Sequence, residues 1–259
     1  MNKFMKAGAA MLMACSVFAG CSNGSADKDS GTADTGKEEA KEILVGISPD
    51  YPPYESKEGE DIVGFDADMA DWVFKYLQDN GDNYTFRFKE MSFDTIVSAI
   101  QADQIDLGIS GFTYDEERAQ NVAFSEPYAK SSQVVVVTSE ADIASADDLN
   151  GKKVGAQLGS TGENAANDVE GANVQTYTDV KVEMEALKSG ALDACVVDEA
   201  VAKNYVDNGD YKIVDTLLDE EVYIIANKEN DELLDKINTA IKAFKDSDDY
   251  ETLKEKWGI

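Results

Sequence analysis

Hydrophobic and polar positions follow two alternating periods along most of the chain, which predicts alternating strands and helices. Residues 43–47 are a continuous apolar run, typical of a buried strand, and residues 66–78 place apolar side chains on one helical face. Residues 84–89 alternate aromatic and polar side chains, which is the period of a half-buried strand. A short helix over 92–102 and a strand over 105–109 follow. This order predicts a mostly parallel sheet with helices on its faces.

The same order of elements restarts in the second half of the chain. The predicted strands are 133–138, 153–156, 174–177, 192–197 and 221–226, and the predicted helices are 160–169, 180–188, 199–207, 231–245 and 249–257. Two tandem α/β units with closing helices predict two lobes joined by two crossover strands. We expect residues 43–131 plus 224–259 to form lobe 1, and residues 132–223 to form lobe 2. A small-ligand site is expected in the cleft between them.

The amino-terminal residues have the pattern of a secretory leader. Lys3 and Lys6 precede an apolar run that ends at Gly20, too short to span a bilayer as a helix. Two small residues directly before Cys21 resemble a bacterial lipobox, in which the cysteine thiol carries lipid; the alternative is a plain signal peptide cut nearby. Residues 21–42, without aromatic or large aliphatic side chains, predict a flexible tether. We therefore expect residues 1–20 to be a lipoprotein signal peptide and the body to be extracytoplasmic, held at the cell membrane by lipid.

Charge and composition exclude several classes of function. The formal net charge of −29 repels polyanions, so a nucleic-acid partner is not expected. The complete absence of His excludes Ser-His-Asp and Cys-His catalysis and His-liganded zinc. The glycines at 159–162 lack both the Lys of a phosphate-binding loop and the spacing of a dinucleotide fingerprint. We expect no cofactor and no metal ion.

Arginine is rare, because only two of the 23 basic residues are Arg. Arg87 falls on the polar face of a predicted strand. Arg118 lies shortly after a strand end, where its planar guanidinium could bind a carboxylate in bidentate fashion. The alternative for Arg118 is a local ion pair with Asp115, Glu117 or Glu126.

Two short motifs combine helix capping with possible anion binding. Thr113-x-x-Glu116 and Ser160-x-x-Glu163 both fit a capping box. The glycines flanking Ser160 follow a predicted strand and open a helix, so backbone N–H groups there could also hold a small anion. Capping and ligand binding are compatible, and the sequence leaves both open.

Aromatic and acidic residues near predicted strand ends are the other candidates. Tyr51 begins a Tyr-Pro-Pro-Tyr turn after the first strand, and Phe93 lies at the start of a helix. Either ring could face a ligand or simply pack within a lobe. Asp198 and Glu199 end a strand, where one of them could receive a ligand ammonium or favour the amino end of the following helix.

Several ordered motifs between residues 43 and 259 carry a family resemblance. They are the segments 46–55, 63–68, 105–106, 110–118, 124–128, 149–155, 159–162 and 191–198, together with Phe93. In this order and spacing they resemble the polar amino-acid family of periplasmic-type solute-binding proteins, the extracytoplasmic receptors of ABC importers. The resemblance implies the type II periplasmic-binding-protein fold, an α/β architecture with two lobes, each a mostly parallel sheet flanked by helices, and two crossover strands as hinge.

The resemblance also implies a role for each site residue. Arg118 would bind the ligand α-carboxylate, and Asp198 would bind the α-ammonium. The assisting groups would be the Thr113 hydroxyl and the N–H groups of Ser160 and Thr161 for the carboxylate, and the Ser110 carbonyl for the ammonium. Tyr51 and Phe93 would sandwich the ligand side chain. Positions that would tune selectivity are Ser48, Tyr54, Glu55 and Gln157.

The ligand expected from this resemblance is a polar L-amino acid with a basic or amide side chain, because only Arg118 is cationic near these motifs. Cystine or another polar amino acid is an alternative. The permease and ATPase would be separate chains, and the receptor itself would be a monomer. A rival hypothesis is an enzyme on the same fold, such as an amino-acid dehydratase, with Glu163 or Glu199 as acid or base. A signalling domain is a third, but it would require an attached transducer. We expect binding and not catalysis.

Overall fold

The computed structural model describes residues 40–207 and 209–259. The predicted signal peptide, the lipidation candidate Cys21 and most of the predicted tether lie outside these residues. The first strand, β1 (Lys41–Ile47), starts two residues inside the range predicted as tether. Ile43, Val45 and Ile47 are buried and Leu44 is half-buried, as the continuous apolar run predicts, and the strand lies between β5 and β6 in the sheet.

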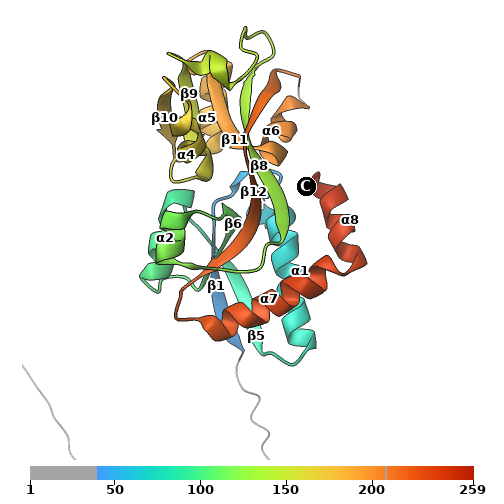
Figure 1. The fold of residues 1–259 in the computed structure, drawn as a ribbon. Coiled ribbons are helices and arrows are strands. Elements are labelled where there is room, and N and C mark those ends of the chain that lie inside the picture. The colour runs from blue at the N-terminus through green and yellow to red at the C-terminus, as the bar shows by residue number, and fades with distance from the viewer. Residues whose placement is uncertain (1–39, 208) are drawn as a thin grey trace, which may run out of the picture. The chain divides into compact units, whose positions relative to one another are not determined.

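One large sheet organises the described residues (Figure 1), and its strand order is β10-β9-β11-β8-β12-β6-β1-β5 with β7 paired to β12. The strands after β1 are β5 (Tyr84–Glu90), β6 (Leu107–Thr113), β7 (Ala123–Phe124), β8 (Ala129–Thr138), β9 (Lys153–Gln157), β10 (Asn173–Tyr177), β11 (Ala194–Asp198) and β12 (Tyr211–Ala226). β1 pairs in parallel with β5 and β6, and β9 pairs in parallel with β10 and β11. The two central strands, β8 and β12, are antiparallel to each other and to their outer neighbours.

Helices divide into two sets along this sheet. The helices are α1 (Phe65–Asp79), α2 (Phe93–Gln101), α3 (Glu116–Asn121), α4 (Thr161–Asp168), α5 (Val180–Lys188), α6 (Glu199–Val206), α7 (Asp231–Lys245) and α8 (Asp248–Trp257). We call β1–β6 with α1–α3, α7 and α8 the first α/β group; it includes the short strands β2–β4 described below. We call β9–β11 with α4–α6 the second α/β group. The chain passes from the first group to the second through β8 and returns through β12 (Figure 1).

Several element boundaries differ from the sequence prediction, most of all at β12. This strand begins at Tyr211, ten residues before the predicted 221, and pairs with β8 from Tyr211 opposite Thr138 to Val222 opposite Ala129. Its first half is mostly only partly buried, and its aliphatic residues fall in adjacent pairs (Ile213-Val214 and Leu217-Leu218), so no alternating hydrophobic period marks it. β8 likewise begins at 129 and not 133, and β6 spans 107–113 and not 105–109.

Small elements were not predicted at all. They are α3, β7, the 3₁₀ turn Ala146–Leu149, and a three-stranded sheet made of β2 (Asp50–Tyr51), β3 (Glu55–Glu58) and β4 (Asp61–Val63). Two- to four-residue strands are too short to show a hydrophobic period. The small sheet matters because it holds Tyr51 and Glu55.

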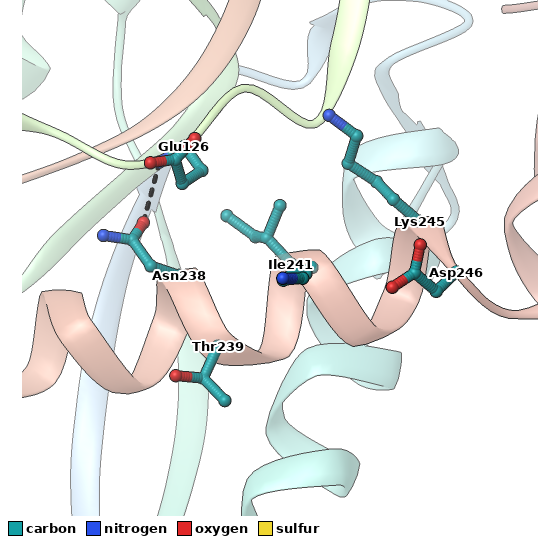
Figure 2. A pocket seen from close by; sticks show the side chains of 7 residues that line it. Glu126, Asn238, Thr239, Ile241, Lys245 and Asp246 are labelled. Atoms are coloured by element: carbon teal, nitrogen blue, oxygen red, sulfur yellow. Dashed lines mark hydrogen bonds between the residues drawn. The ribbon is translucent and has the colours of Figure 1, made fainter.

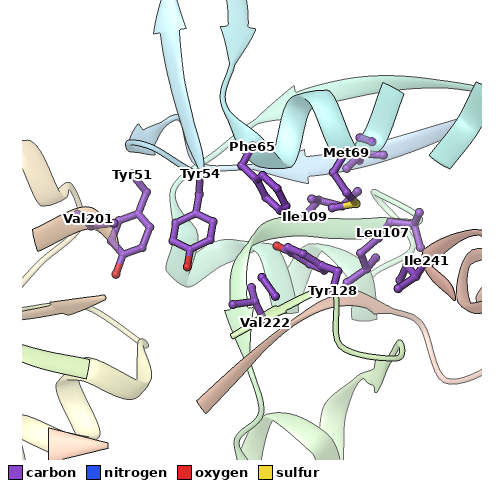
Figure 3. Packing of buried hydrophobic residues seen from close by; sticks show 14 of the residues in the cluster. Tyr51, Tyr54, Phe65, Met69, Leu107, Ile109, Tyr128, Val201, Val222 and Ile241 are labelled. Carbon is purple, nitrogen blue, oxygen red and sulfur yellow. The ribbon is translucent and has the colours of Figure 1, made fainter. Parts of the chain in front are cut away.

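A hydrophobic cluster continues through both α/β groups (Figure 3). It includes Tyr51 and Tyr54, whose rings stack with centroids 6.1 Å apart, and it reaches Val201 of the second group. In the first group it continues through Phe65 and Tyr128, whose rings stack at 6.1 Å. The two tyrosines of the predicted aromatic turn are therefore buried between the groups. The same side chains belong to the hydrophobic core and to the candidate site.

Gly64 is expected to be the most sensitive glycine at the start of α1. Its φ of 143° and ψ of 177° lie in a region that only glycine adopts readily, and an added Cβ would lie 2.0 Å from the Tyr54 carbonyl oxygen. Gly64→Ala should lower the free energy of unfolding by about 3 kcal/mol or more, measured by urea denaturation. The matched control is Gly81→Ala, also at positive φ but with open space around it, which should cost about 1 kcal/mol. Equal losses in the two variants would contradict this account.

Candidate functional site

Arg118 lies in α3, immediately after β6, and its side chain reaches from the first α/β group to the second. Its Nη1 donates to the Thr113 carbonyl oxygen at 2.5 Å, and its Nη2 donates to the Gly159 carbonyl oxygen at 2.8 Å. The guanidinium also lies over the rings of Phe93 and Phe112, 5.6 and 5.2 Å from their centroids. Only 8% of Arg118 is exposed, so this is a buried cation held by carbonyl dipoles and aromatic faces.

Neither local alternative for this segment describes the structure. Within residues 40–207 and 209–259, Arg118 makes no ion pair, with Asp115, Glu117, Glu126 or any other carboxylate. The capping box predicted at Thr113 is wrong, because Thr113 ends β6 and Asp115 is the cap, its carboxylate accepting from the Arg118 N–H at 2.8 Å. The guanidinium charge therefore remains available to a ligand carboxylate.

Asp198 ends β11 in the second group and is the acidic counterpart of Arg118. Its Oδ2 accepts from the Tyr51 hydroxyl at 2.5 Å and from Gln133 Nε2 at 2.9 Å, and its Oδ1 accepts from the Ser131 hydroxyl. Burial raises the pKa of Asp198, and these hydrogen bonds oppose the rise by stabilising the carboxylate. The side chain does not cap α6, so its place is set by the site and not by the helix.

Aromatic residues of the first group meet these charges. The Tyr51 hydroxyl both donates to the Asp198 carboxylate and accepts from the Asp198 N–H at 3.1 Å, so it links β2 to β11. Phe93 begins α2 and stacks on Phe112 with ring centroids 4.6 Å apart. An open cleft of about 380 Å³ runs beside Phe93 and Arg118 and is bordered on the other side by residues of the α4 segment.

The amino end of α4 brings hydroxyl groups to the same place. The Thr113 and Thr161 hydroxyl oxygens, one from each group, lie 2.8 Å apart. Ser160 caps α4, because its hydroxyl accepts from the Glu163 N–H at 3.1 Å, and the Glu163 carboxylate accepts from the Gly159 N–H at 2.7 Å. The Ser160 N–H donates to the Gln157 carbonyl oxygen at 3.2 Å, so it is engaged in a turn, unlike the N–H that the resemblance implies.

Two of the predicted selectivity residues, Ser48 and Gln157, are connected through Asp50. The Ser48 hydroxyl donates to Asp50 Oδ1 at 2.6 Å, and Gln157 Nε2 donates to Asp50 Oδ2 at 3.3 Å. The Val180 N–H at the start of α5 also donates to Asp50 Oδ2, at 2.8 Å. Burial raises the pKa of Asp50, and the hydrogen bonds from Ser48 and Val180 oppose this. Asp50 thus joins the small sheet of the first group to the second group.

Glu55 lies behind Ser110 and supports it. The Ser110 hydroxyl donates to Glu55 Oε1 at 2.6 Å and accepts from the Ser48 N–H at 3.0 Å. Beside it, Asp66 accepts from the Gly111 N–H at 2.9 Å and from the Tyr128 hydroxyl at 2.8 Å. Burial raises the pKa of Glu55 well above its usual range and that of Asp66 to about 6. The two acids therefore fix the Ser110-Gly111 backbone.

Gln133 and Glu220 are two residues that sequence reasoning missed. They come from β8 and β12, and Gln133 Nε2 donates to Glu220 Oε1 at 2.6 Å as well as to Asp198. The Thr161 hydroxyl donates to the same Glu220 oxygen at 3.0 Å. A signal for Gln133 existed, since it is a polar residue that begins an otherwise apolar run. Glu220 had none, because its strand was not predicted.

A separate hollow on α7 contains none of the predicted site residues (Figure 2). It has a volume of about 470 Å³ and is bordered by Glu126, Asn238 and Lys245 among others. The Glu126 N–H donates to Asn238 Oδ1 at 2.7 Å, and Lys245 Nζ donates to the Pro127 carbonyl oxygen at 2.8 Å. These contacts fasten the segment before β8 to α7, which is a structural role.

A buried guanidinium in one α/β group and a buried carboxylate in the other are each hydrogen-bonded to the opposite group, and the two groups are joined by two strands. This arrangement is that of a two-lobed solute-binding protein. Residues 43–259 match the bacterial extracellular solute-binding proteins, family 3, and the chain belongs to that family. The arginine-binding extracellular protein ArtP of Bacillus subtilis (strain 168) is 33% identical over 254 residues, which cover 95% of each chain.

Solved structures agree with this membership. An ancestral arginine-binding protein bound to arginine is 39% identical with a TM-score of 0.78, covering 85% of this chain and 99% of that chain. An ancestral arginine-binding protein bound to glutamine is 40% identical with the same TM-score and coverage. The predicted fold class and the predicted resemblance to polar amino-acid solute-binding proteins are therefore confirmed. The individual site residues, the lobe boundaries and the lipid anchor stay predictions.

Proposed function

We propose that this protein binds an L-amino acid with a basic or amide side chain between the two α/β groups and delivers it to an ABC permease. The observation that carries the proposal is that one group supplies buried Arg118 and the other buried Asp198, and that each side chain is hydrogen-bonded to the opposite group, Arg118 to the Gly159 carbonyl oxygen and Asp198 to the Tyr51 hydroxyl. A zwitterion needs one cation and one carboxylate at close range, and buried charges of this kind are costly unless a partner meets them.

The surroundings of this pair support a basic or amide side chain over an acidic one. Arg118 is the one buried cation among the described residues, whereas the site and its immediate support contain the buried acids Asp50, Asp66 and Asp198. An added carboxylate there would meet like charges. The names of the relatives agree, because ArtP is an arginine-binding protein and the two ancestral structures hold arginine and glutamine.

Binding and closure are coupled in this proposal. Lobe 1 (43–131 and 224–259) supplies Arg118 for the α-carboxylate, and lobe 2 (132–223) supplies Asp198 for the α-ammonium. Tyr51 and Phe93 hold the side chain, while β8 and β12 act as the hinge. A ligand that contacts both lobes favours the closed form by its differential affinity for it.

The cellular setting follows from the leader and the family. We propose that lipid on Cys21 anchors the protein outside the cytoplasm, that it works as a monomer, and that permease and ATPase are separate chains. No helix in the described ranges has the length and hydropathy needed to cross a bilayer. We propose binding rather than catalysis because Glu163 is engaged with the Gly159 N–H, and Glu199 pairs with Lys203 Nζ at 2.9 Å on the surface.

Isothermal titration calorimetry with a panel of L-amino acids tests the proposal. We expect one site per chain, with arginine, lysine, histidine or glutamine bound at least about 100-fold more tightly than glutamate or aspartate, because one like-charge contact in a buried site costs several kcal/mol. D-enantiomers are the matched control, since they present the same groups in the wrong geometry. A protein that bound none of the panel, or preferred the acidic members, would refute the proposed function.

A further inference from the structure

Glu220 is a carboxylate that the central strand β12 places at the edge of the site. The residue stands opposite Ser131 of β8, and the Ser131 hydroxyl contacts Asp198. One carboxylate oxygen of Glu220 accepts two hydrogen bonds, from Gln133 Nε2 at 2.6 Å and from the Thr161 hydroxyl at 3.0 Å. Register alone therefore brings Glu220 into the network that surrounds Asp198.

Gln133 ties the two carboxylates together. Its single amide nitrogen donates to Asp198 Oδ2 and to Glu220 Oε1, so these oxygens lie on either side of one donor. The amide oxygen lies beside the first turn of α4, where a Cβ added to Gly162 would be 2.7 Å from it. The Glu220 carboxylate is therefore held beside that of Asp198.

The second oxygen of Glu220 has no partner. Glu220 Oε2 is fully buried as an atom and accepts no hydrogen bond, and Gln133, itself 1% exposed, has an unpartnered amide oxygen. Both groups are acceptors and neither is a donor. Leaving a buried carboxylate oxygen without a hydrogen bond costs more free energy than leaving a neutral oxygen without one. The space beside Glu220 and Gln133 therefore favours a ligand group that has N–H donors and a positive charge.

Charged groups lie on both sides of Glu220, and most of them are acidic. Asp198 of β11 faces it from within the site, and Arg118 of α3 is the nearby cation. On the outer side a hollow of about 510 Å³ reaches Glu220, and its other lining residues are Lys130, Ser131, Ser132, Glu199, Asp219 and Glu221. Burial and the Asp198 charge together raise the pKa of Glu220 to about 7. Near neutral pH this carboxyl group therefore carries its proton about half of the time.

We propose that Glu220 is a second carboxylate for the ligand ammonium, which binds between Asp198 and Glu220. This inference rests on the proposed function and assigns a residue to it. An ammonium group has three N–H donors, so Asp198 leaves donors for the unpartnered oxygen of Glu220. Its positive charge also removes the repulsion between the two carboxylates. Because Glu220 lies on β12, the ammonium is thereby fixed to a strand that joins the two groups.

Proton release is the distinguishing consequence. When an ammonium binds beside Glu220, the ionised carboxylate is favoured, and a protonated Glu220 gives its proton to the buffer. The contrary geometry, in which Glu220 meets the ligand carboxylate at Arg118, would instead favour the protonated acid and take up a proton. The sign of the proton transfer on binding thus separates the two arrangements.

Calorimetry in two buffers of different ionisation enthalpy at pH 7 measures this transfer. With L-arginine or L-glutamine as probe, we expect the wild type to release up to about half a proton per ligand. Glu220→Gln should release less and bind about 10-fold more weakly, because a charge-assisted hydrogen bond becomes a neutral one. The matched control is Glu221→Gln, whose exposed carboxylate accepts from the Tyr223 hydroxyl at 3.2 Å and which should behave as wild type.

Each other outcome has a definite meaning. Net proton uptake by the wild type, or tighter binding by Glu220→Gln, would show that Glu220 opposes the ligand carboxylate and would overturn the inference. Unchanged affinity and unchanged proton release in Glu220→Gln would overturn it as well, and the proposed function would stand. A wild-type protein that binds neither probe nor any other L-amino acid would refute the proposed function itself. Thermal unfolding of both variants verifies that they fold.

Discussion

Arg118→Ala is expected to weaken amino-acid binding by about 1,000-fold, corresponding to about 4 kcal/mol, because it removes the guanidinium that we propose binds the ligand carboxylate. The group is 8% exposed and is held by the Thr113 and Gly159 carbonyl oxygens, so a ligand carboxylate would gain a preformed, desolvated donor. Arg118→Lys should recover only part of the loss, since an ammonium lacks the planar pair of N–H donors. Titration calorimetry with the preferred amino acid measures both effects.

The second arginine of the chain supplies the control. Arg87 lies on β5 and pairs with Glu42 at 3.5 Å on the exposed surface, so Arg87→Ala removes the same charge without touching the site. Its affinity should match that of the wild type. If Arg118→Ala folded with a normal unfolding transition and kept its affinity within about threefold, the carboxylate role of Arg118 would be wrong.

Helices and strands could be predicted from the sequence where one face of the element is buried and the other exposed. They could not be predicted where this contrast between the faces is absent. The helices over 180–188 and 231–245 were predicted to the residue, because each keeps a long apolar stripe on one face. The first ten residues of β12 were missed because the strand carries charges on partly exposed faces while it crosses between the groups. A strand is stabilised there by its pairing with β8, which leaves no trace in local composition.

The site residues divide in the same way. Some can be indicated by local sequence, and others come together only through the register of paired strands. Arg118 and Asp198 could be named as candidates because a rare arginine and an acidic residue follow strand ends, where ligands bind in α/β folds, and the family resemblance added their expected roles. Gln133 and Glu220 could not, because their contact requires β8 and β12 to pair with Ser131 opposite Glu220. The contacts of Asp50 could not be predicted for a related reason, since its partners Gln157 and Val180 belong to the other α/β group.

Glu183 is a carboxylic acid on the buried face of α5. It shares a face of α5 with Val180, Met184 and Leu187, which are all buried, and it is itself 0% exposed. Neither carboxylate oxygen has a hydrogen-bond partner, and an added Cβ at Gly155 would lie 2.9 Å from Glu183 Cγ. Burial raises the pKa of Glu183 to about 8, and the Asp50 charge adds to this. The folded protein therefore holds this side chain as the neutral acid at pH 7.

This buried acid makes stability depend on pH. In the unfolded chain Glu183 loses its proton near its ordinary pKa of 4.5, whereas in the folded chain it keeps the proton up to about pH 8. The folded state therefore binds more protons between these values, and stability falls as pH rises through this window, by on the order of 5 kcal/mol in total. We expect urea denaturation of the wild type to show this fall between pH 5 and pH 8.

Glu183→Gln separates this effect from the repulsion among the many surface carboxylates. Glutamine keeps the shape of the neutral acid but cannot ionise in either state, so the variant should gain on the wild type by about 1.4 kcal/mol per pH unit between pH 5 and pH 8. Glu185→Gln removes an exposed carboxylate from the same helix and should leave the pH slope almost unchanged. Parallel pH slopes for wild type and Glu183→Gln would mean that Glu183 ionises in the folded protein, so water or a cation would have to reach a carboxylate that has no protein partner. The difference between the two helix variants in the pH dependence of the free energy of unfolding therefore measures how strongly the interior next to β9 disfavours the ionised form of Glu183.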